Sequence, residues 1–297
     1  MGRGAILLSL ICLWVNACKS EHATVPSPKL SAELSTELST ATLTIPRAEF
    51  TENIGARSVS FMARDLETDT VYVLEGSDLD TRYTPWSTFK IPNLILALET
   101  NAAPNLDHKI IWDKEHFPAQ SFWPKSWQDD LTLRQAFRRS AAWYFRDISL
   151  KVPNQVYRDT LSDWGYGNVD ITDGSDSFWL DRTLKISVNE QTAFLARLTT
   201  DELNIQSTSF EALKNASRQF DTEDKMTLHG KTGSGPILAN DFDGEFEGWF
   251  VGFIMSNHTK PTVFALYTRA ENYDAIRNFR QDFAITLLEH TQLLRTK

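Results

Sequence analysis

The chain has 297 residues, of which 41% are hydrophobic and 11% aromatic, so it can bury a substantial core and is neither fibrous nor disordered as a whole. Its 30 Lys and Arg residues against 39 Asp and Glu residues give a net charge of −9, which argues against a nucleic-acid partner, because such binding needs clustered positive charge. The two cysteines, Cys12 and Cys18, both lie near the N-terminus, so the rest of the chain has no disulfide.

The N-terminal segment has the pattern of an export signal. One arginine, Arg3, precedes an apolar run at 5–15, which is shorter than the ~20 residues that a membrane-spanning helix needs. We therefore expect residues 1–17 to be a signal peptide and the mature protein to be periplasmic. The letters VNAC at 15–18 resemble a bacterial lipobox, in which Cys18 would be lipidated and would anchor the chain to the membrane. They also suit ordinary cleavage after the alanine, so both routes stay open.

Residues 18–45 are rich in Ser, Thr, Glu and Pro and contain the direct repeat ELSTELST at 33–40. The repeat could form a short helix, but its low hydrophobicity favours a disordered linker. We expect the folded domain to occupy residues 46–297. Its segment ARSVSFMARDLETDTVYVLEG at 56–76 has two β-rich runs around a polar turn, which predicts a hairpin.

The centre of the chain is predicted to be helical, and its last third to return to strands. Apolar residues recur at helical spacing in segments 93–100, 131–150, 152–167 and 188–200. Strand-like runs follow at 224–235, 247–257 and 261–269, and an amphipathic helix is predicted at 274–294. This order predicts an α+β fold, with an antiparallel sheet built from the N- and C-terminal segments beside an all-helical lobe. A small-molecule site is expected in a cleft between the lobes.

Several kinds of catalytic site lack support in this sequence. The six histidines show no H-x-x-x-H spacing and no paired cysteines accompany them, so we expect no metal. The chain also has no G-x-S-x-G motif and no G-x-x-x-x-G-K loop. An α/β hydrolase and a nucleotide-binding protein are therefore disfavoured.

The stretch TPWSTFKIPN at 84–93 contains a serine and a lysine three residues apart. In a helical turn the Ser87 hydroxyl and the Lys90 amine face the same way. Their neighbours are apolar, and desolvation can lower the pKa of a lysine by up to ~3–5 units, so a neutral Lys90 could be the base that activates Ser87. Pro92 places both residues at the very start of a helix, where free backbone N–H groups can stabilise an oxyanion. On its own, the spacing fits an ordinary helix start with a snorkelling lysine better.

Three further elements follow in order along the chain. SAA at 140–142 places a hydroxyl in the middle of a predicted helix, where it could relay a proton or bond to the helix backbone. YGN at 166–168 is typical of a turn. KTGSG at 231–235 suits an edge strand that binds a substrate carboxylate, or a solvent-exposed strand that ends in a glycine turn. Each element alone has an ordinary structural explanation, and their order and separation carry the evidence.

In this order the elements resemble the penicillin-recognising serine enzymes, and the surrounding sequence is similar to the class D β-lactamases, or oxacillinases. The similar blocks are YTPWSTFKIPNLILALE, TLRQAFRRSAAWYFRDIS, YGN, FWLDRTLKISVNEQTAFLARL, HGKTGSG and GWFVGF. The resemblance covers about residues 55–290 and implies a two-lobed β-lactamase/transpeptidase-like fold with a catalytic domain at 46–297. It also implies hydrolysis of small-molecule β-lactam antibiotics, and hence resistance, by a monomer or homodimer without a metal or other cofactor apart from carbon dioxide.

The resemblance implies a role for each matching catalytic residue. Ser87 would attack the lactam carbonyl and form an acyl-enzyme. Lys90, carboxylated by carbon dioxide to N6-carboxylysine, would be the general base. Ser140 would pass a proton to the leaving nitrogen, assisted by Lys231. Thr232 and Arg280 would bind the substrate carboxylate, and Arg280 matches this position better than Arg277. Ser234 and Ser87 would form the oxyanion hole. The remaining matches are Gly233, Tyr166 and Asn168 along the cleft, and Trp179 and Ala142 beside the carbamate.

Two positions depart from the pattern of the family. The second residue after Ser140 is valine in the family and is Ala142 here, which removes two methyl groups beside Lys90. The residue after Lys-Thr-Gly is often bulky in the family and is Ser234 here, which changes the shape of the substrate mouth. Neither departure removes a catalytic group.

Two other functions remain open at this point. A penicillin-binding sensor or a D,D-peptidase would form the same acyl-enzyme and keep it, and a lipoprotein binding module with a decayed site would form none. Trp179 and the apolar surroundings of Lys90 favour hydrolysis. Which β-lactams are substrates depends on loop shapes that the sequence does not define.

Overall fold

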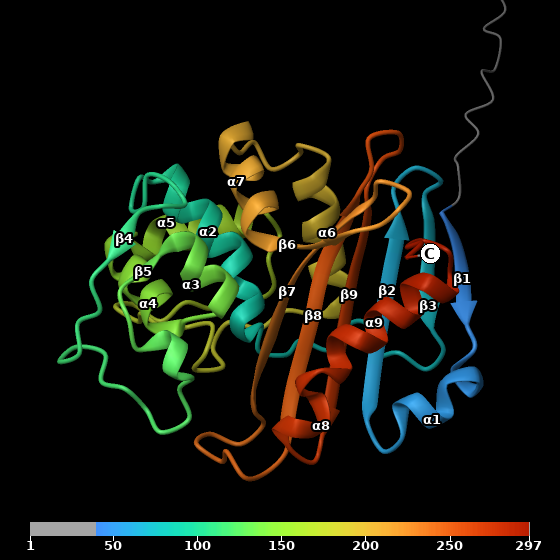
Figure 1. The fold of residues 1–297 in the computed structure, drawn as a ribbon, viewed down its shortest axis with the longest axis horizontal. Coiled ribbons are helices and arrows are strands. Elements are labelled where there is room, and N and C mark those ends of the chain that lie inside the picture. Colours follow the sequence, from blue (N-terminus) through green and yellow to red (C-terminus); the bar gives the residue numbers. More distant parts are fainter. Residues whose placement is uncertain (1–39, 297) are drawn as a thin grey trace, which may run out of the picture. The chain divides into compact units, whose positions relative to one another are not determined.

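The structure, a computed structural model, describes residues 40–296. A seven-stranded sheet with the order β1-β3-β2-β9-β8-β7-β6 forms the centre of this part of the chain (Figure 1). Neighbouring strands are antiparallel, apart from β1, which runs parallel to β3. The strands are β1 (Ala41–Ile45), β2 (Ser58–Asp65), β3 (Thr70–Leu74), β6 (Arg218–Asp221), β7 (Thr227–Pro236), β8 (Phe246–Met255) and β9 (Thr262–Ala270).

The first and last segments of the domain share this sheet, as predicted. β2 and β3 form the expected hairpin. β2 also pairs with β9 over its whole length, from Ser58 opposite Arg269 to Asp65 opposite Thr262. The predicted α+β fold is therefore confirmed.

The predicted boundary at residue 45 between linker and domain is wrong, because residues 41–45 form β1. Only Ile45 of this strand is buried, so the strand gives almost no hydrophobic signal in the sequence. It is held by its backbone pairing with β3, which lies far along the chain and cannot be read from local composition. The predicted signal peptide, Cys18 and the linker residues 18–39 lie outside the described residues.

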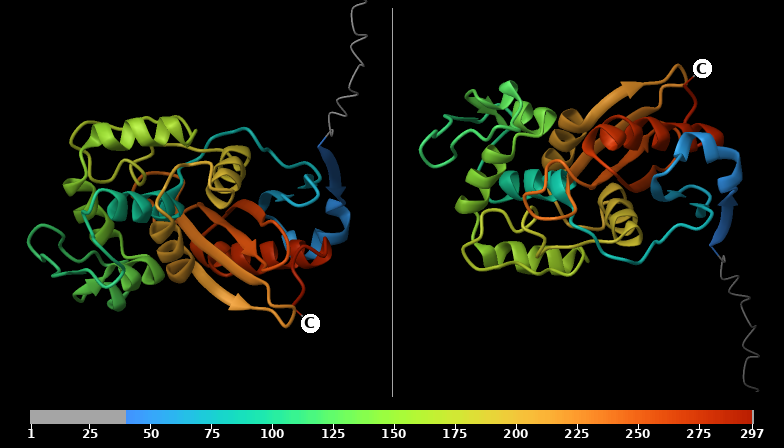
Figure 2. Two further views of the ribbon diagram at one scale, coloured as in Figure 1. Left: turned by 90° about the horizontal axis from the view of Figure 1, so that it is seen from above. Right: turned by 90° about the horizontal axis from the view of Figure 1, so that it is seen from below.

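Helices pack on both faces of the sheet (Figure 2). One face carries η1 (Arg47–Phe50), α1 (Thr51–Ile54), α8 (Tyr273–Arg277) and α9 (Phe279–His290). Side chains of β8 alternate between the faces, so Phe250 and Ile254 join a core with α9 while Trp249 and Val251 join the core on the other side. The helix predicted at 274–294 is present as α8 and α9, with a break at Asn278.

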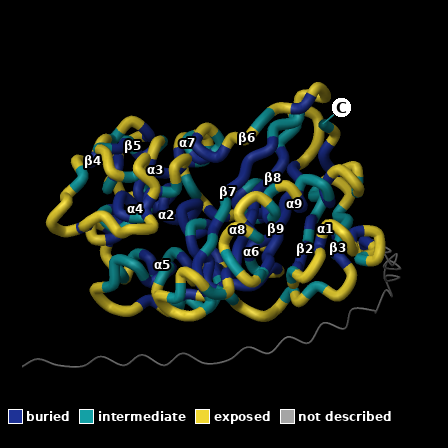
Figure 3. Tube along the Cα trace, turned by 60° about the horizontal axis from the view of Figure 1, so that its bottom comes forward, coloured by how far each residue is buried: buried dark blue, intermediate teal, exposed yellow. Residues whose placement is uncertain are grey.

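The other face is covered by α6 (Val188–Thr199), which packs against β9 and β2, and a helical lobe lies beside β7 (Figure 1). The lobe and its connections contain η2 (Trp86–Phe89), α2 (Lys90–Glu99), η3 (Lys125–Trp127), α3 (Leu133–Arg139), α4 (Ala142–Lys151), α5 (Asn154–Asp163) and α7 (Ser207–Ser217). A short ladder of β4 (Lys109–Ile110) and β5 (Leu131–Thr132) interrupts the helices. Buried residues run through α2, α4, β7 and β8 (Figure 3), so the lobe and the sheet meet in a continuous core. Within residues 40–296, no helix is long and apolar enough to cross a membrane.

Candidate active site

Ser87 and Lys90 lie at the start of α2, as the position of Pro92 predicted. Ser87 is in the 3-10 turn η2, and Lys90 is the first residue of α2. Lys90 Nζ donates a hydrogen bond to Ser87 Oγ over 2.8 Å. Ser87 is half-buried, whereas Lys90 is completely buried. A hydroxyl that a ligand can reach is thus paired with an amine that water cannot reach.

The surroundings of Lys90 disfavour its charged form. Burial lowers the pKa of Lys90 to about 7, because the ammonium group would lose its hydration. The amine lies over the ring of Phe145 on α4, 5.4 Å from the ring centre. Among the described residues no acidic group forms a salt bridge with Lys90. A neutral amine near pH 7 can accept the proton of Ser87 or react with carbon dioxide, and an ammonium group can do neither.

Aromatic rings pack around Phe89, the residue before Lys90. Phe89 stacks on Trp179 with ring centroids 5.2 Å apart. Trp179 is fully buried, and its indole Nε1–H has no hydrogen-bond partner in the part of the chain that the structure describes. A buried donor without a partner typically costs ~1–3 kcal/mol. The indole therefore marks a place where an additional acceptor would stabilise the protein.

Tyr166 and Asn168 each make defined contacts near the site. Tyr166 is fully buried, with its ring against Phe89 at 5.8 Å between centroids. The amide of Asn168 donates to the Thr183 carbonyl oxygen (2.9 Å) and accepts from the Lys185 N–H (2.8 Å). Both contacts hold the loop that carries Trp179. The side chain of Tyr166 is thus used in packing and that of Asn168 in fixing the loop, and their expected position along the cleft stays a prediction.

Strand β7 brings the KTGSG segment against the nucleophile turn. A Cβ at Gly233 would lie 2.7 Å from the Pro85 carbonyl oxygen and 3.1 Å from the Ser87 nitrogen, so only glycine permits this approach. β6 pairs with β7 only at residues 227–229. Within residues 40–296 no strand pairs with the remainder of this edge of β7 beside Ser87, and an extended ligand can lie along such an edge.

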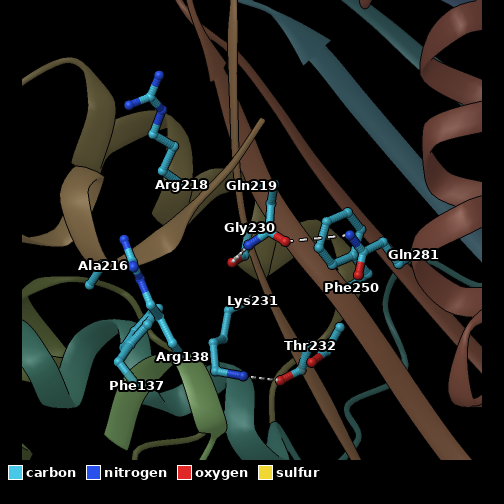
Figure 4. Close-up of a pocket in the computed structure, with 10 residues that line it drawn as sticks. All are labelled: Phe137, Arg138, Ala216, Arg218, Gln219, Gly230, Lys231, Thr232, Phe250 and Gln281. Carbon is cyan, nitrogen blue, oxygen red and sulfur yellow. Dashed lines mark hydrogen bonds between the residues drawn. The ribbon is translucent and has the colours of Figure 1, made fainter. Parts of the chain in front are cut away.

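Lys231 connects β7 to the helical lobe. Its Nζ donates to Ser140 Oγ at 3.0 Å and to the Thr232 carbonyl oxygen at 2.9 Å, the second of which is drawn in Figure 4. Only 5% of Lys231 is exposed. Burial, together with the neighbouring charges of Lys90 and Arg280, holds the pKa of Lys231 well below its usual range. A proton on Lys231 is thus easily given up toward Ser140.

Ser140 is not in the middle of a helix, so that prediction is wrong. α3 ends at Arg139, and Ser140 follows with a left-handed backbone, φ 60°. α4 begins again at Ala142. This break directs the Ser140 hydroxyl to Lys231, where an uninterrupted helix would have offered it a carbonyl of the preceding turn. Ala142, the first of the two departures from the family pattern, is half-buried at the first position of α4.

Arg280 lies on α9 next to the strand that pairs with β7. Its Cδ atom is 3.3 Å from where a Cβ of Gly248 would be, and Gly248 is opposite Ser234 in the ladder. Arg280 is only 6% exposed, and its Nε and Nη1 atoms have no partner within residues 40–296. Arg277, the alternative, is exposed. Arg280 is therefore the better placed of the two to receive a carboxylate near Ser234.

A pocket of about 270 Å³ adjoins the same strand (Figure 4). Lys231 and Thr232 of β7 form one side of it, and Phe137 of α3 and Gln281 of α9 contribute to the others. Ser87 is not part of its lining. This pocket thus lies beside the middle of β7, at Lys231 and Thr232.

Geometry and sequence agree on one family. The model of the penicillin binding protein transpeptidase domain matches residues 59–280, and the chain belongs to this family. Within it, the chain is homologous to class D β-lactamases. It is 34% identical over 201 residues to the probable β-lactamase YbxI of Bacillus subtilis, a match that covers 67% of this chain and 70% of that protein. The crystal structure of a class D β-lactamase from Sebaldella termitidis matches with a TM-score of 0.75 at 26% identity, over 86% of this chain and 100% of that one.

A regulatory protein is also similar to this chain. The chain is 29% identical over 208 residues to the regulatory protein BlaR1 of Staphylococcus aureus, which covers 69% of this chain but 33% of that protein. The chain thus spans about a third of the length of this relative. Family membership alone therefore does not separate β-lactam hydrolysis from regulation.

Two contributors to the site were not anticipated from the sequence. Phe145 lies over Lys90, but its helical spacing indicated only a core residue. Glu247 of β8 accepts a hydrogen bond of 2.8 Å from the indole of Trp86, the residue before Ser87. The visible signal for Glu247 was an acid inside the apolar run FEGWFVGF at 246–253, because a charge in such a strand needs partners.

Proposed function

We propose that this chain is a class D β-lactamase that hydrolyses penicillins and related β-lactams through an acyl-enzyme on Ser87, and so gives antibiotic resistance. The observation that carries the proposal is the complete burial of Lys90 at 2.8 Å from Ser87, with a pKa lowered to about 7. Such a lysine is largely neutral near physiological pH and can be carboxylated by carbon dioxide. The unpaired indole N–H of Trp179 supports this, because a donor-only group stabilises an anion.

In the acylation step, the carboxylated Lys90 removes the proton from Ser87 as the oxygen attacks the lactam carbonyl. The backbone N–H groups of Ser87 and Ser234 stabilise the oxyanion, and the close contact at Gly233 keeps these two stretches of backbone together. Ser140 then passes a proton to the leaving nitrogen. Lys231, whose amine is 3.0 Å from the Ser140 hydroxyl, replaces that proton.

Substrate binding uses the side of β7 that faces α9. Thr232 borders the open pocket, and Arg280 is buried against Gly248 with unused donors. A carboxylate on the substrate would satisfy those donors and neutralise a buried charge. Such a ligand would place its lactam carbonyl over the edge of β7 beside Ser87.

Before deacylation, the carboxylated Lys90 passes on the proton taken from Ser87, which restores the proton that Lys231 gave up. The same base on Lys90 then activates a water molecule that attacks the acyl-enzyme. This step distinguishes hydrolysis from stable acylation, because it needs a base that survives next to the ester. The apolar surroundings that disfavour a charged ammonium on Lys90 support such a base. We further propose export to the periplasm, with the N-terminal segment removed or lipidated at Cys18.

The second candidate function is a penicillin sensor, which the similarity to the regulatory protein BlaR1 favours. A sensor would form the Ser87 acyl-enzyme and retain it. The two functions are separated by adding excess nitrocefin to the purified mature protein. Hydrolysis predicts many turnovers per molecule, absent in Ser87→Ala, and a single stoichiometric burst would contradict the proposal in favour of the sensor.

A further inference from the structure

Trp86, the residue directly before Ser87, has a left-handed backbone with φ 51°. Residues other than glycine rarely adopt this region, and a bulky side chain there is strained unless its surroundings hold it. The backbone of Trp86 sets the direction in which the chain enters Ser87. The position of the Ser87 hydroxyl and N–H therefore depends on whatever fixes Trp86.

The indole of Trp86 is fixed by contacts with three other parts of the fold. Its Nε1–H donates to Glu247 Oε1 on β8 over 2.8 Å, between residues 161 positions apart. Its ring packs so closely on β7 that a Cβ at Gly235 would lie 2.3 Å from ring atoms. The guanidinium of Arg182 lies 5.7 Å from the ring centre. Among these contacts, the one with Glu247 is directional and specific to an indole.

Glu247 is an unusual residue for its position. It is 7% exposed, in a strand where the other residues from 246 to 254 are also buried. Its second oxygen accepts a hydrogen bond of 2.6 Å from Tyr267 on β9. Burial raises the pKa of Glu247, while the donors Tyr267 and Trp86 and the charges of Arg269 and Arg182 oppose that change.

A buried acid contributes little to stability compared with an apolar side chain of similar size, because its desolvation offsets its hydrogen bonds. Both donors to Glu247 are aromatic side chains, so the carboxylate orients them without neutralising a cation in direct contact. One of those side chains belongs to the residue before the nucleophile. The arrangement therefore suits positioning better than stabilisation.

We infer that Glu247 is a positioning residue for the nucleophile: through the indole of Trp86 it holds the left-handed turn that directs Ser87 toward β7. Trp86 also touches β7 at Gly235, next to Ser234, so the same hydrogen bond fixes the separation of the Ser87 and Ser234 backbones. This inference rests on the proposed function in one respect, that Ser87 is the residue acylated by β-lactams. Glu247 itself touches no reacting atom.

The test measures the rate constant for acylation of Ser87 by a fluorescent penicillin in single-turnover experiments on the mature protein. Glu247→Leu and Trp86→Phe each remove the hydrogen bond, and each should slow acylation by about 10- to 100-fold. The double variant should be no slower than the slower single variant, because both changes remove the same interaction. Glu247→Gln keeps an acceptor for the indole and should restore acylation to within about threefold of the wild type.

The matched control is Tyr267→Phe, which removes the other hydrogen bond to Glu247 and leaves the bond to Trp86 in place. It should change acylation by less than about threefold. Circular dichroism and the thermal midpoint establish that each variant is folded. If Glu247→Leu does not fold, Trp86→Phe tests the same hydrogen bond, because it leaves the bond between Glu247 and Tyr267 intact.

The result that would overturn the inference is acylation at the wild-type rate in folded Trp86→Phe or Glu247→Leu. Equal losses in Tyr267→Phe and Glu247→Leu would also overturn it, because the effect would then not depend on Trp86. The acylation rate can be measured whether or not the acyl group is later hydrolysed. Acylation without turnover in the wild type would thus contradict the proposed hydrolysis and leave the test of Glu247 valid.

Discussion

The site contains two lysine–serine pairs that are nearly equal in geometry and different in surroundings. Lys90 is 2.8 Å from Ser87 in the helical lobe, and Lys231 on β7 is 3.0 Å from Ser140. Both lysines are buried, and burial lowers the pKa of both. Each lysine lies over one phenylalanine ring, Lys90 over Phe145 and Lys231 over Phe137, but within residues 40–296 only Lys231 also donates to a backbone carbonyl oxygen. A backbone acceptor favours an ammonium group on Lys231, and nothing comparable among residues 40–296 favours one on Lys90.

This difference shows that the distance between a lysine amine and a serine hydroxyl does not decide whether the lysine acts as a base or as a proton donor. The pair with an added backbone acceptor suits a proton donor, and the pair without one suits a base. The two lysines also affect each other, because the charge of Lys90 lowers the pKa of Lys231. Carboxylation would reverse the sign of that charge and would favour the protonated form of Lys231. Formation of the carbamate on Lys90 would thus favour the protonated Lys231 that donates toward Ser140.

The largest effect on turnover is expected from replacing Lys90, the lysine of the pair in the helical lobe. Lys90→Met has a similar volume and removes the base for both half-reactions, so turnover should fall by about 10³- to 10⁴-fold. The free energy of unfolding should not fall, since an apolar side chain replaces a buried amine. Nitrocefin hydrolysis and urea unfolding measure the two quantities. Retained turnover would contradict the assignment of Lys90 as the base.

A smaller effect is expected from the pair on the strand side. Lys231→Met removes the donor behind Ser140 and should slow acylation by about 10²-fold. Deacylation, which uses the base at Lys90, should change by less than about tenfold. Single-turnover acylation by a labelled penicillin and the decay of the acyl-enzyme separate the two rates. If both rates fell equally, the two lysines would not have the distinct tasks that their surroundings indicate.

The sequence predicts the contact between Ser87 and Lys90 better than the contact between Ser140 and Lys231, for a physical reason. The contact between Ser87 and Lys90 follows from the geometry of one helical turn. The contact between Ser140 and Lys231 spans 91 positions and needs a break between α3 and α4, which helical periodicity does not reveal. The hydrogen bond between Trp86 and Glu247 and the pairing of β1 with β3 likewise depend on distant segments. Local chemistry was thus readable, and the long-range contacts that orient it were not.

The smallest effect is expected for the pair of Ser87 and Lys90 alone. Lys90 has a pKa of about 7, so the neutral amine that reacts with carbon dioxide predominates above that pH and is lost as the pH falls below it. Activity should therefore decline on the acid side of pH 7, and added bicarbonate should restore part of it. Trp179→Phe keeps a ring on Phe89 but removes the unpaired N–H, so the bicarbonate concentration for half-maximal activity should rise about tenfold. Nitrocefin assays at several bicarbonate concentrations, after dialysis at acid pH, measure this requirement.

The control for that measurement is Trp112→Phe, because the indole N–H of Trp112 already donates to the Phe117 carbonyl oxygen at 2.9 Å. Its bicarbonate requirement should equal that of the wild type. Equal shifts in Trp112→Phe and Trp179→Phe would show a general loss of packing, and a wild type indifferent to bicarbonate would remove the carbamate from the mechanism. A shift confined to Trp179→Phe would thus tie the carbamate on Lys90 to the indole N–H of Trp179.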